Sequence, residues 1–284
     1  MKGPLKRVLY FPLIRIIAGI ALCFYALVTV QNYITKPFFY SIISSRPIAG
    51  TIVNYISVAV LLASYYYLFR YYERRKITEL SVRKFMIEWP GGFVMGFLVL
   101  SVVILILYLA GYYSVAGISG FSYLLAPFSV LVVAALLEEL FFRLIIYRIL
   151  EQWIGTYWAL ALSTFAFALP HLENDHVYVL SGLMMLVFGF AHGAMYLYTG
   201  RLWLPFAFHL GWNLAQPFYG SNLSGIEDPA ILQSRFEGPT LLTGSDFGIE
   251  DSILSIIFLL AIGVVFFQLA RKKGKIVIKR KGKI

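Results

Sequence analysis

The segment Leu136-Leu137-Glu138-Glu139-Leu140-Phe141-Phe142-Arg143 places two adjacent carboxylates and an arginine inside a long apolar run. Almost all of the other residues from 121 to 150 are aliphatic or aromatic, which predicts a membrane-spanning helix. An ionised side chain at the centre of such a helix costs roughly 2.5–3.5 kcal/mol on insertion scales. Three of them within six positions must therefore be paired with one another, hydrated in a cavity, or both.

The spacing within this segment separates the two carboxylates into different roles. Residues four apart are neighbours on the surface of an α-helix, so Glu139 and Arg143 are expected to form a supporting ion pair. Glu138 points well away from Arg143 and needs another partner. We therefore expect the chemistry of this site at Glu138.

The composition predicts an all-α, polytopic membrane helix bundle. Of the 284 residues, 60% are hydrophobic and only 13% are charged, whereas a soluble domain carries about 25% charged residues. The single cysteine, Cys23, excludes an intrachain disulfide and a cysteine-based metal cluster. The formal net charge is +10, but the basic residues flank apolar runs, as in proteins that follow the positive-inside rule. This distribution predicts contact with membrane lipids and argues against nucleic acid as a partner.

Eight apolar runs are long enough to cross a bilayer, which predicts about eight transmembrane helices. The basic segment 70–84 places both termini inside and the loop 219–250 outside, where it can act as a lid or as an inert surface loop. We expect a multi-pass protein of a bacterial or archaeal cell membrane. The predicted spans lie at approximately 8–34, 49–70, 90–112, 121–150, 153–171, 178–199, 202–218 and 251–270.

Further polar side chains are expected near the depth of Glu138. His171 ends the fifth predicted span, and His209 and Asn213 lie four apart in the seventh. At about 1.5 Å per residue, Glu138 and His171 are each roughly 20–27 Å from the turn that joins their helices. One carboxylate, two imidazoles and a carboxamide are thus expected to meet inside the bundle. His192, in the sixth span, is expected to be a hydrogen-bonded core histidine.

Such a set suits amide hydrolysis without a covalent intermediate. A carboxylate and an imidazole can deprotonate water, and a second imidazole with an amide NH₂ can donate hydrogen bonds to a developing oxyanion. The same glutamate and two histidines can instead hold zinc, with water as the fourth ligand. Asn213 is a poor zinc ligand and a good oxyanion donor, which favours a metal-independent site.

Three motifs resemble those of one family, the CAAX-protease and bacteriocin-processing intramembrane endopeptidases. The run from Glu138 to Arg143 resembles its EExxxR motif, Phe167-Ala168-Leu169-Pro170-His171 its FxxxH motif, and His209-Leu210-Gly211-Trp212-Asn213 its HxxxN motif. Leu144 stands where many bacterial relatives have glycine. The resemblance covers about 121–218.

The resemblance implies an eight-helix fold with a site inside the membrane. By it, Glu138 and His171 activate water, while His209 and Asn213 bind the oxyanion. The implied substrate is a membrane-bound, prenylated or otherwise hydrophobic peptide. The chain then divides into N-terminal transmembrane helices 1–3 (1–120), a catalytic four-helix core (121–218), and an outer loop with the last helix and a basic tail (219–284).

Two other function classes explain the same residues. A non-catalytic immunity or scaffold protein would use the fold to bind a peptide. A proton-coupled transporter would use Glu138 as its proton carrier, although the chain lacks the internal repeat that is frequent in transporters. Peptide cleavage that is lost in Glu138→Gln favours the peptidase, whereas flux driven by a proton gradient favours the transporter.

Overall fold

The computed structural model describes residues 4–120, 125–227 and 229–279, and most of them are helical. The chain is a polytopic helical membrane protein, as predicted. Within these described ranges, five helical segments are long and apolar enough to cross a membrane: Pro12–Ile42, Arg46–Tyr72, Val82–Leu109, Val179–Thr199 and Ile253–Lys272. The helices are α1 (Pro4–Leu9), α2 (Pro12–Val30), α3 (Lys36–Ile42), α4 (Arg46–Tyr72), α5 (Val82–Leu109), α6 (Leu125–Glu139), α7 (Arg148–Ile154), α8 (Thr156–His171), α9 (Val179–Thr199), α10 (Trp203–Tyr219), α11 (Thr240–Thr243) and α12 (Ile253–Lys272).

Each of the eight predicted spans coincides with helix, but three of them do not qualify as membrane spans by length and composition alone. Helices α8 and α10 have 16 and 17 residues. The fourth run is divided after α6 by the π-helix η3 (Leu140–Tyr147), and its residues 121–124 lie outside the described residues. The count of eight transmembrane helices therefore stays a prediction.

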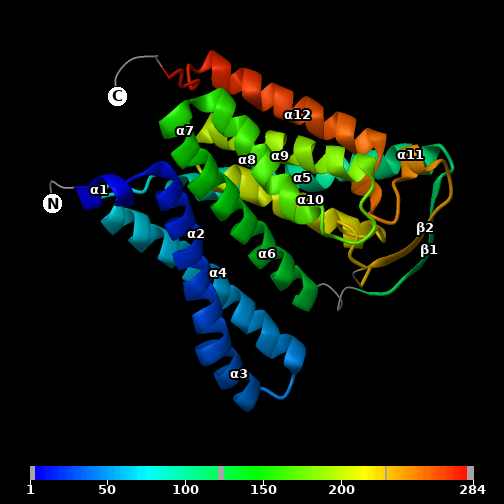
Figure 1. Cartoon of the computed structure of the whole chain (residues 1–284). Helices are drawn as coiled ribbons and strands as arrows, with labels where there is room; N and C mark the ends of the chain where they lie inside the picture. The colour runs from blue at the N-terminus through cyan, green and yellow to red at the C-terminus, as the bar shows by residue number, and fades with distance from the viewer. Residues whose placement is uncertain (1–3, 121–124, 228, 280–284) are drawn as a thin grey trace.

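The prediction of an all-α chain was wrong in one place. Strand β1 (Tyr113–Ile118) pairs antiparallel with β2 (Leu232–Phe236), with Tyr113 opposite Phe236. The strands lie more than a hundred residues apart in the sequence, and neither carries a strong alternating pattern, so only the tertiary fold reveals the pairing. Figure 1 shows this small sheet at the end of the bundle opposite to α1.

The third span begins earlier than predicted. Helix α5 starts at Val82 rather than near 90 and continues through Pro90. Arg83 and Lys84 end the apolar run but not the helix, because both are good helix formers that can lie among the headgroups.

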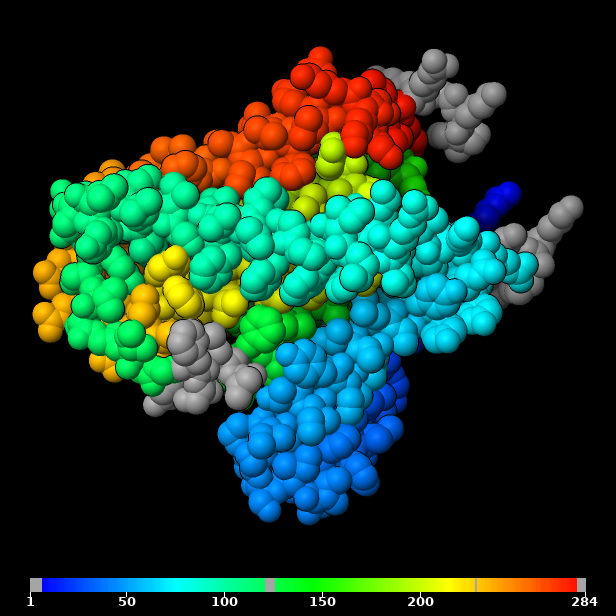
Figure 2. All heavy atoms as spheres, turned by 180° about the vertical axis from the view of Figure 1, so that it is seen from behind, coloured from blue at the N-terminus to red at the C-terminus, as the bar shows by residue number. Residues whose placement is uncertain are grey.

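Close packing of α5 against α10 positions the helix that carries the HxxxN motif. A Cβ added to Gly211 would lie 2.1 Å from the carbonyl oxygen of Phe93, and one added to Gly96 would lie 2.1 Å from that of Phe208. Only glycine permits this approach of the two backbones. Figure 2 shows α5 lying across the back face with α10 behind it.

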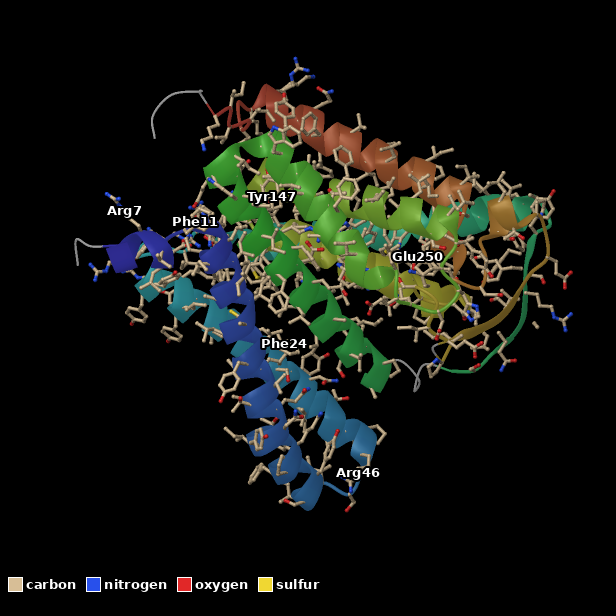
Figure 3. The ribbon with its side chains drawn as sticks, in the orientation of Figure 1. Arg7, Phe11, Phe24, Arg46, Tyr147 and Glu250 are labelled. Carbon is tan, nitrogen blue, oxygen red and sulfur yellow. The ribbon has the colours of Figure 1, made fainter. Side chains whose placement is uncertain are left out.

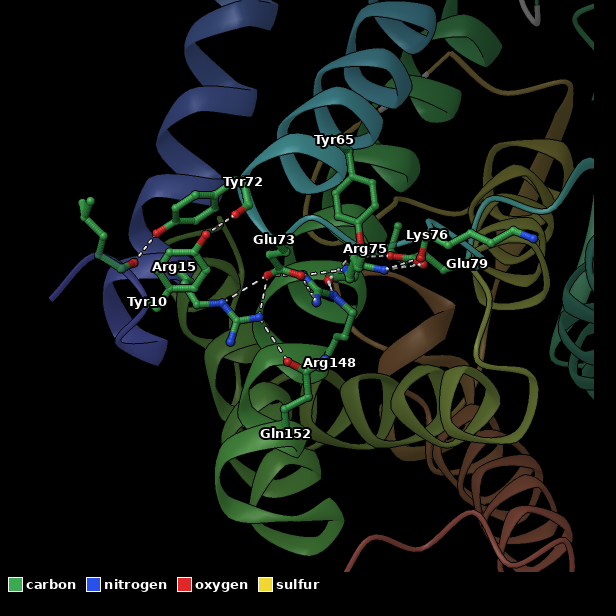
Figure 4. Close-up of polar contacts among 12 residues, drawn as sticks. Tyr10, Arg15, Tyr65, Tyr72, Glu73, Arg75, Lys76, Glu79, Arg148 and Gln152 are labelled. Atoms are coloured by element: carbon green, nitrogen blue, oxygen red, sulfur yellow. Dashed lines mark hydrogen bonds and ion pairs between the residues drawn. The ribbon is translucent and has the colours of Figure 1, made fainter. Parts of the chain in front are cut away.

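The N-terminal helices form a hairpin that stands out from the body (Figures 1 and 2). A buried polar network holds its base, as Figure 4 shows. Glu73 accepts hydrogen bonds from Arg15 (Nη2, 2.5 Å), Arg148 (Nη1, 2.8 Å) and Arg75 (Nε, 2.7 Å). Burial raises the pKa of Glu73, but Arg148 and Arg15 outweigh it and hold that pKa below its usual value.

Candidate active site

The helix that carries the two adjacent glutamates changes its winding directly after them. Glu138 and Glu139 end α6, and Arg143 lies in the π-helix η3 that follows. π-Helical segments are rare in proteins, and those that occur often lie at functional sites. Arg143 Nε lies 3.2 Å from Glu139 Oε2, and both side chains are buried. The predicted pair is present.

Glu138 lies apart from this pair and faces a cavity. Its side chain is 26% exposed, whereas that of Glu139 is fully buried. Glu138 Oε2 lies 3.8 Å from His171 Nε2 and 3.8 Å from His209 Nε2. These distances are too long for direct hydrogen bonds but bring three side chains from three helices around one point.

The hydrogen bond of His171 decides which of its ring nitrogens carries a proton. Its Nδ1 lies 2.9 Å from the carbonyl oxygen of Phe167, one helical turn earlier in α8. A carbonyl only accepts, so Nδ1 must donate. A neutral His171 ring therefore directs the lone pair of Nε2 towards Glu138.

His209 is held by Glu139, a contact that sequence reasoning missed. Its Nδ1 lies 3.0 Å from Glu139 Oε1, so Glu139 serves Arg143 with one oxygen and His209 with the other. An ionised carboxylate only accepts hydrogen bonds, which makes His209 Nδ1 the donor. The sequence held one indication of this contact: a pair with Arg143 occupies one oxygen of Glu139 and leaves the other oxygen in need of a donor.

One cavity of about 420 Å³ brings the four predicted catalytic side chains together. Asn213 lies on its wall, one turn after His209. The walls are mostly apolar. The lining residues are Val130, Leu131, Ala134, Glu138, Phe142, Phe167, Pro170, His171, Asn174, Met185, Phe188, His209, Asn213, Leu223, Ser224, Ile226 and Glu250.

His192 lies behind this cavity as a buried core histidine. Its Nδ1 is 2.9 Å from the carbonyl oxygen of Phe188, on whose ring it stacks at 3.9 Å. Among the described residues, one group of potential metal ligands comprises Glu139, His192 and His209, with ligand atoms within 4.8 Å of one another. The positive charge of Arg143 on Glu139 disfavours a cation there, and full burial leaves no access for substrate.

The residues facing the cavity, Glu138, His171 and His209, offer ligand types that suit zinc. Glu138 Oε2 lies 3.8 Å from each Nε2 atom, but these three ligand atoms do not form a group within 4.8 Å of one another, as the buried set does. Ligand atoms around a tetrahedral zinc ion lie about 3.3 Å apart, so zinc here would require the side chains to move closer together. The other ring nitrogen of each histidine is bonded to a carbonyl or a carboxylate, as is usual for zinc-bound histidines.

Residues 119–215 match the family described as type II CAAX prenyl endopeptidase, Rce1-like. The chain carries an Rce1-like domain. The match confirms the resemblance inferred from the three motifs, covers about a third of the chain and includes all six predicted site residues. No characterised protein and no solved structure matches the chain. The Rce1-like domain ends before the 219–250 loop, so the cavity residues Leu223, Ser224, Ile226 and Glu250 lie outside it.

Proposed function

We propose that the chain is an intramembrane peptidase that hydrolyses a peptide bond of a membrane-associated protein or peptide. The observation that carries this proposal is the position of Glu138 Oε2, 3.8 Å from Nε2 of both His171 and His209 in a cavity that Asn213 also lines. Membership of the Rce1-like family, whose members are typically peptidases, supports it.

Glu138 and His171 activate the attacking water. Both the carboxylate and the free Nε2 of His171 accept hydrogen bonds, and their separation of 3.8 Å lets one substrate water bond to both. As the water oxygen attacks the carbonyl carbon, Glu138 takes the proton. When the C–N bond breaks, the same proton passes to the leaving amine, so Glu138 is restored.

His209 and Asn213 stabilise the oxyanion. Because His209 Nδ1 donates to Glu139, Nε2 can donate only if the ring is an imidazolium. The carboxylate of Glu139 compensates that charge. The side-chain amide of Asn213 supplies a second, neutral donor.

Zinc bound by Glu138, His171 and His209 would supply a more acidic water at the same place. We favour the metal-independent site, because Asn213 on the cavity wall is suited to an oxyanion and poorly suited to zinc.

The apolar walls of the cavity favour a hydrophobic or prenylated peptide that arrives from the membrane. We further propose that all eight helical runs cross the bilayer of a bacterial or archaeal cell. Residues 1–120 then carry helices 1–3, 121–218 the catalytic core, and 219–284 the outer loop, the last helix and the basic tail. The shorter α10 is almost wholly buried by its neighbours, whereas α8 presents an exposed apolar face that includes Trp158 and Phe165.

Comparison of membranes that contain active protein with membranes that contain Glu138→Gln tests this function. An uncut precursor that accumulates with the variant, and is cleaved by the purified wild-type protein, supports the peptidase. Identical membrane proteomes, with undiminished peptide binding, would favour the immunity or scaffold alternative. Solute flux into liposomes that follows a proton gradient would favour the transporter.

A further inference from the structure

A buried carboxylate outside the Rce1-like domain lines the same cavity as the catalytic set. Glu250 lies in the 3-10 helix η4 (Ile249–Asp251) just before α12 and is only 1% exposed. Figure 3 shows it within the body, towards the end of the bundle that carries the sheet. An acidic residue in a polar loop is ordinarily solvated, so this burial requires an explanation.

Four neutral donors saturate the carboxylate. Glu250 Oε1 accepts from the backbone N–H (2.7 Å) and the hydroxyl (2.6 Å) of Ser224. Glu250 Oε2 accepts from Trp212 Nε1 (3.2 Å) and Gln216 Nε2 (3.0 Å). Burial raises the pKa of Glu250, although these hydrogen bonds oppose the rise. Each oxygen thus joins Glu250 to a different part of the chain.

One of these parts is the catalytic helix. Trp212 directly precedes Asn213 and lies three residues after His209, and Gln216 lies one turn further along α10. Two hydrogen bonds to side chains one turn apart fix the rotation of the helix about its axis. That rotation sets the direction of His209 and Asn213.

The other part is the segment Leu223–Ile226, which we call the roof. Leu223, Ser224 and Ile226 line the cavity, and a backbone bridge joins Leu223 to Ile226. Asn174 Nδ2 donates to the Ser224 carbonyl (2.9 Å), which ties the roof to the segment after α8.

We propose that Glu250 is a positioning residue that locks the roof to α10, covering the cavity and holding His209 and Asn213 in their catalytic orientation. The catalytic part of this inference rests on the proposed peptidase function. The closure of the roof does not. If Glu250 only stabilised its own loop, its replacement would change neither access to the cavity nor turnover.

Glu250→Gln tests the lock with little change in shape. The amide replaces one acceptor oxygen by an NH₂ donor. Trp212 Nε1 on one side and the Ser224 backbone N–H on the other can only donate, so the oxygen that is lost leaves one of them without its acceptor. Asp246→Asn is the matched control, because Asp246 lies in the same loop with an exposed side chain. Opening of the roof is measured in a Cys23→Ala background that carries Leu223→Cys, by the rate of reaction with a water-soluble maleimide. Leu223 is 8% exposed, so its replacement reacts slowly while the roof is closed.

Glu250→Gln should accelerate this labelling about tenfold or more, because local opening exposes the roof without global unfolding. The native Cys23, which is fully buried between the N-terminal helices, should stay unreactive in a separate Glu250→Gln protein. For a cleaved peptide, kcat should fall about tenfold while KM changes little, because misplaced catalytic groups impair turnover more than binding. Asp246→Asn should change none of these values.

Unchanged labelling would overturn the lock, and so would a reactive Cys23, since the whole bundle would then have opened. Faster labelling with unchanged kcat would overturn the positioning of α10. If the wild-type protein cleaves no peptide at all, the proposed function fails, whereas the labelling rates still decide whether Glu250 closes the roof.

Discussion

Replacing Glu139 by glutamine should weaken both the fold and catalysis, whereas the same change at Glu138 should affect catalysis alone. Glu139 is fully buried and holds Arg143 with one oxygen and His209 with the other. Glu138 has a partly exposed side chain, and its Oε2 has no hydrogen-bond partner among the residues that the structure describes. The two neighbouring glutamates therefore form a matched pair of substitutions.

The magnitudes follow from the partners that are left behind. Without the charge of Glu139, the buried guanidinium of Arg143 keeps a 3.4 Å contact with the Gly189 carbonyl and the ring of Phe167 at 4.7 Å. Breaking a buried ion pair costs about 3–5 kcal/mol, and the remaining amide oxygen reduces this, so we expect a loss of about 3 kcal/mol in the free energy of unfolding. His209 also loses the anion that stabilises its imidazolium form. Since one oxyanion donor is worth about 10²–10³ in kcat, turnover should fall roughly a hundredfold.

Unfolding in detergent and cleavage of a membrane peptide by the same preparations measure both effects. Glu138→Gln should abolish cleavage and leave the unfolding midpoint near that of the wild type, because a neutral amide cannot take the proton from water. If Glu139→Gln is inactive while Glu138→Gln still cleaves, the roles are reversed. Wild-type stability and turnover in Glu139→Gln would refute the double function of this carboxylate.

Three further predictions concern the oxyanion, the metal and the hairpin base. Asn213→Ala should lower kcat about 10²–10³-fold with little change in KM, as steady-state kinetics would show. Removal of zinc by a chelator should leave cleavage intact; stoichiometric zinc that is lost together with activity in His171→Ala would contradict this. Glu73→Gln should lower the free energy of unfolding at neutral pH by about 3 kcal/mol. Glu88→Gln is the control and should change that free energy little, because the ion pair of Glu88 with Arg201 is more exposed. Because folding lowers the pKa of Glu73, the stability that its carboxylate contributes is present above about pH 4 and is lost as the pH falls through the folded pKa. Melting curves of the wild type and of Glu73→Gln should therefore converge in acid.

The sequence predicted that the chain is a polytopic helical membrane protein and which residues meet in the cavity, because length and spacing set the depth of a side chain along a helix. Spacing does not set the rotation of one helix against another. The contact between Glu139 and His209 depends on that rotation, and the close approach of α5 and α10 at Gly96 and Gly211 contributes to it. Glu139 was therefore predicted as a partner of Arg143 alone.

The roof was beyond sequence reasoning for a different reason. The 219–250 loop is polar and lacks periodicity, so it was equally compatible with a lid and with an inert surface loop. In the structure, four residues of this loop line the cavity: Leu223, Ser224, Ile226 and Glu250. The burial of Glu250 depends on Trp212 and Gln216, two side-chain donors on the largely apolar helix that also carries His209 and Asn213. Those donors were the available signal, since polar groups inside a membrane bundle need acceptors.

The balance of charge explains why two carboxylates and an arginine can share the interior of the bundle. Glu138, Glu139 and Arg143 carry a net charge of −1, and an imidazolium at His209 makes the set neutral. In the proposed mechanism, Glu138 gains a proton during attack by water and loses its charge while the oxyanion gains one, so the sum does not change. The negative charge moves from Glu138, whose Oε2 lies 3.8 Å from His209 Nε2, to an oxyanion that would accept a hydrogen bond from that nitrogen. In a medium of low dielectric constant, such a transfer avoids the cost of creating a new unpaired charge. In the proposed mechanism, Glu139 is the anion beside His209 that compensates an imidazolium on both sides of the reaction.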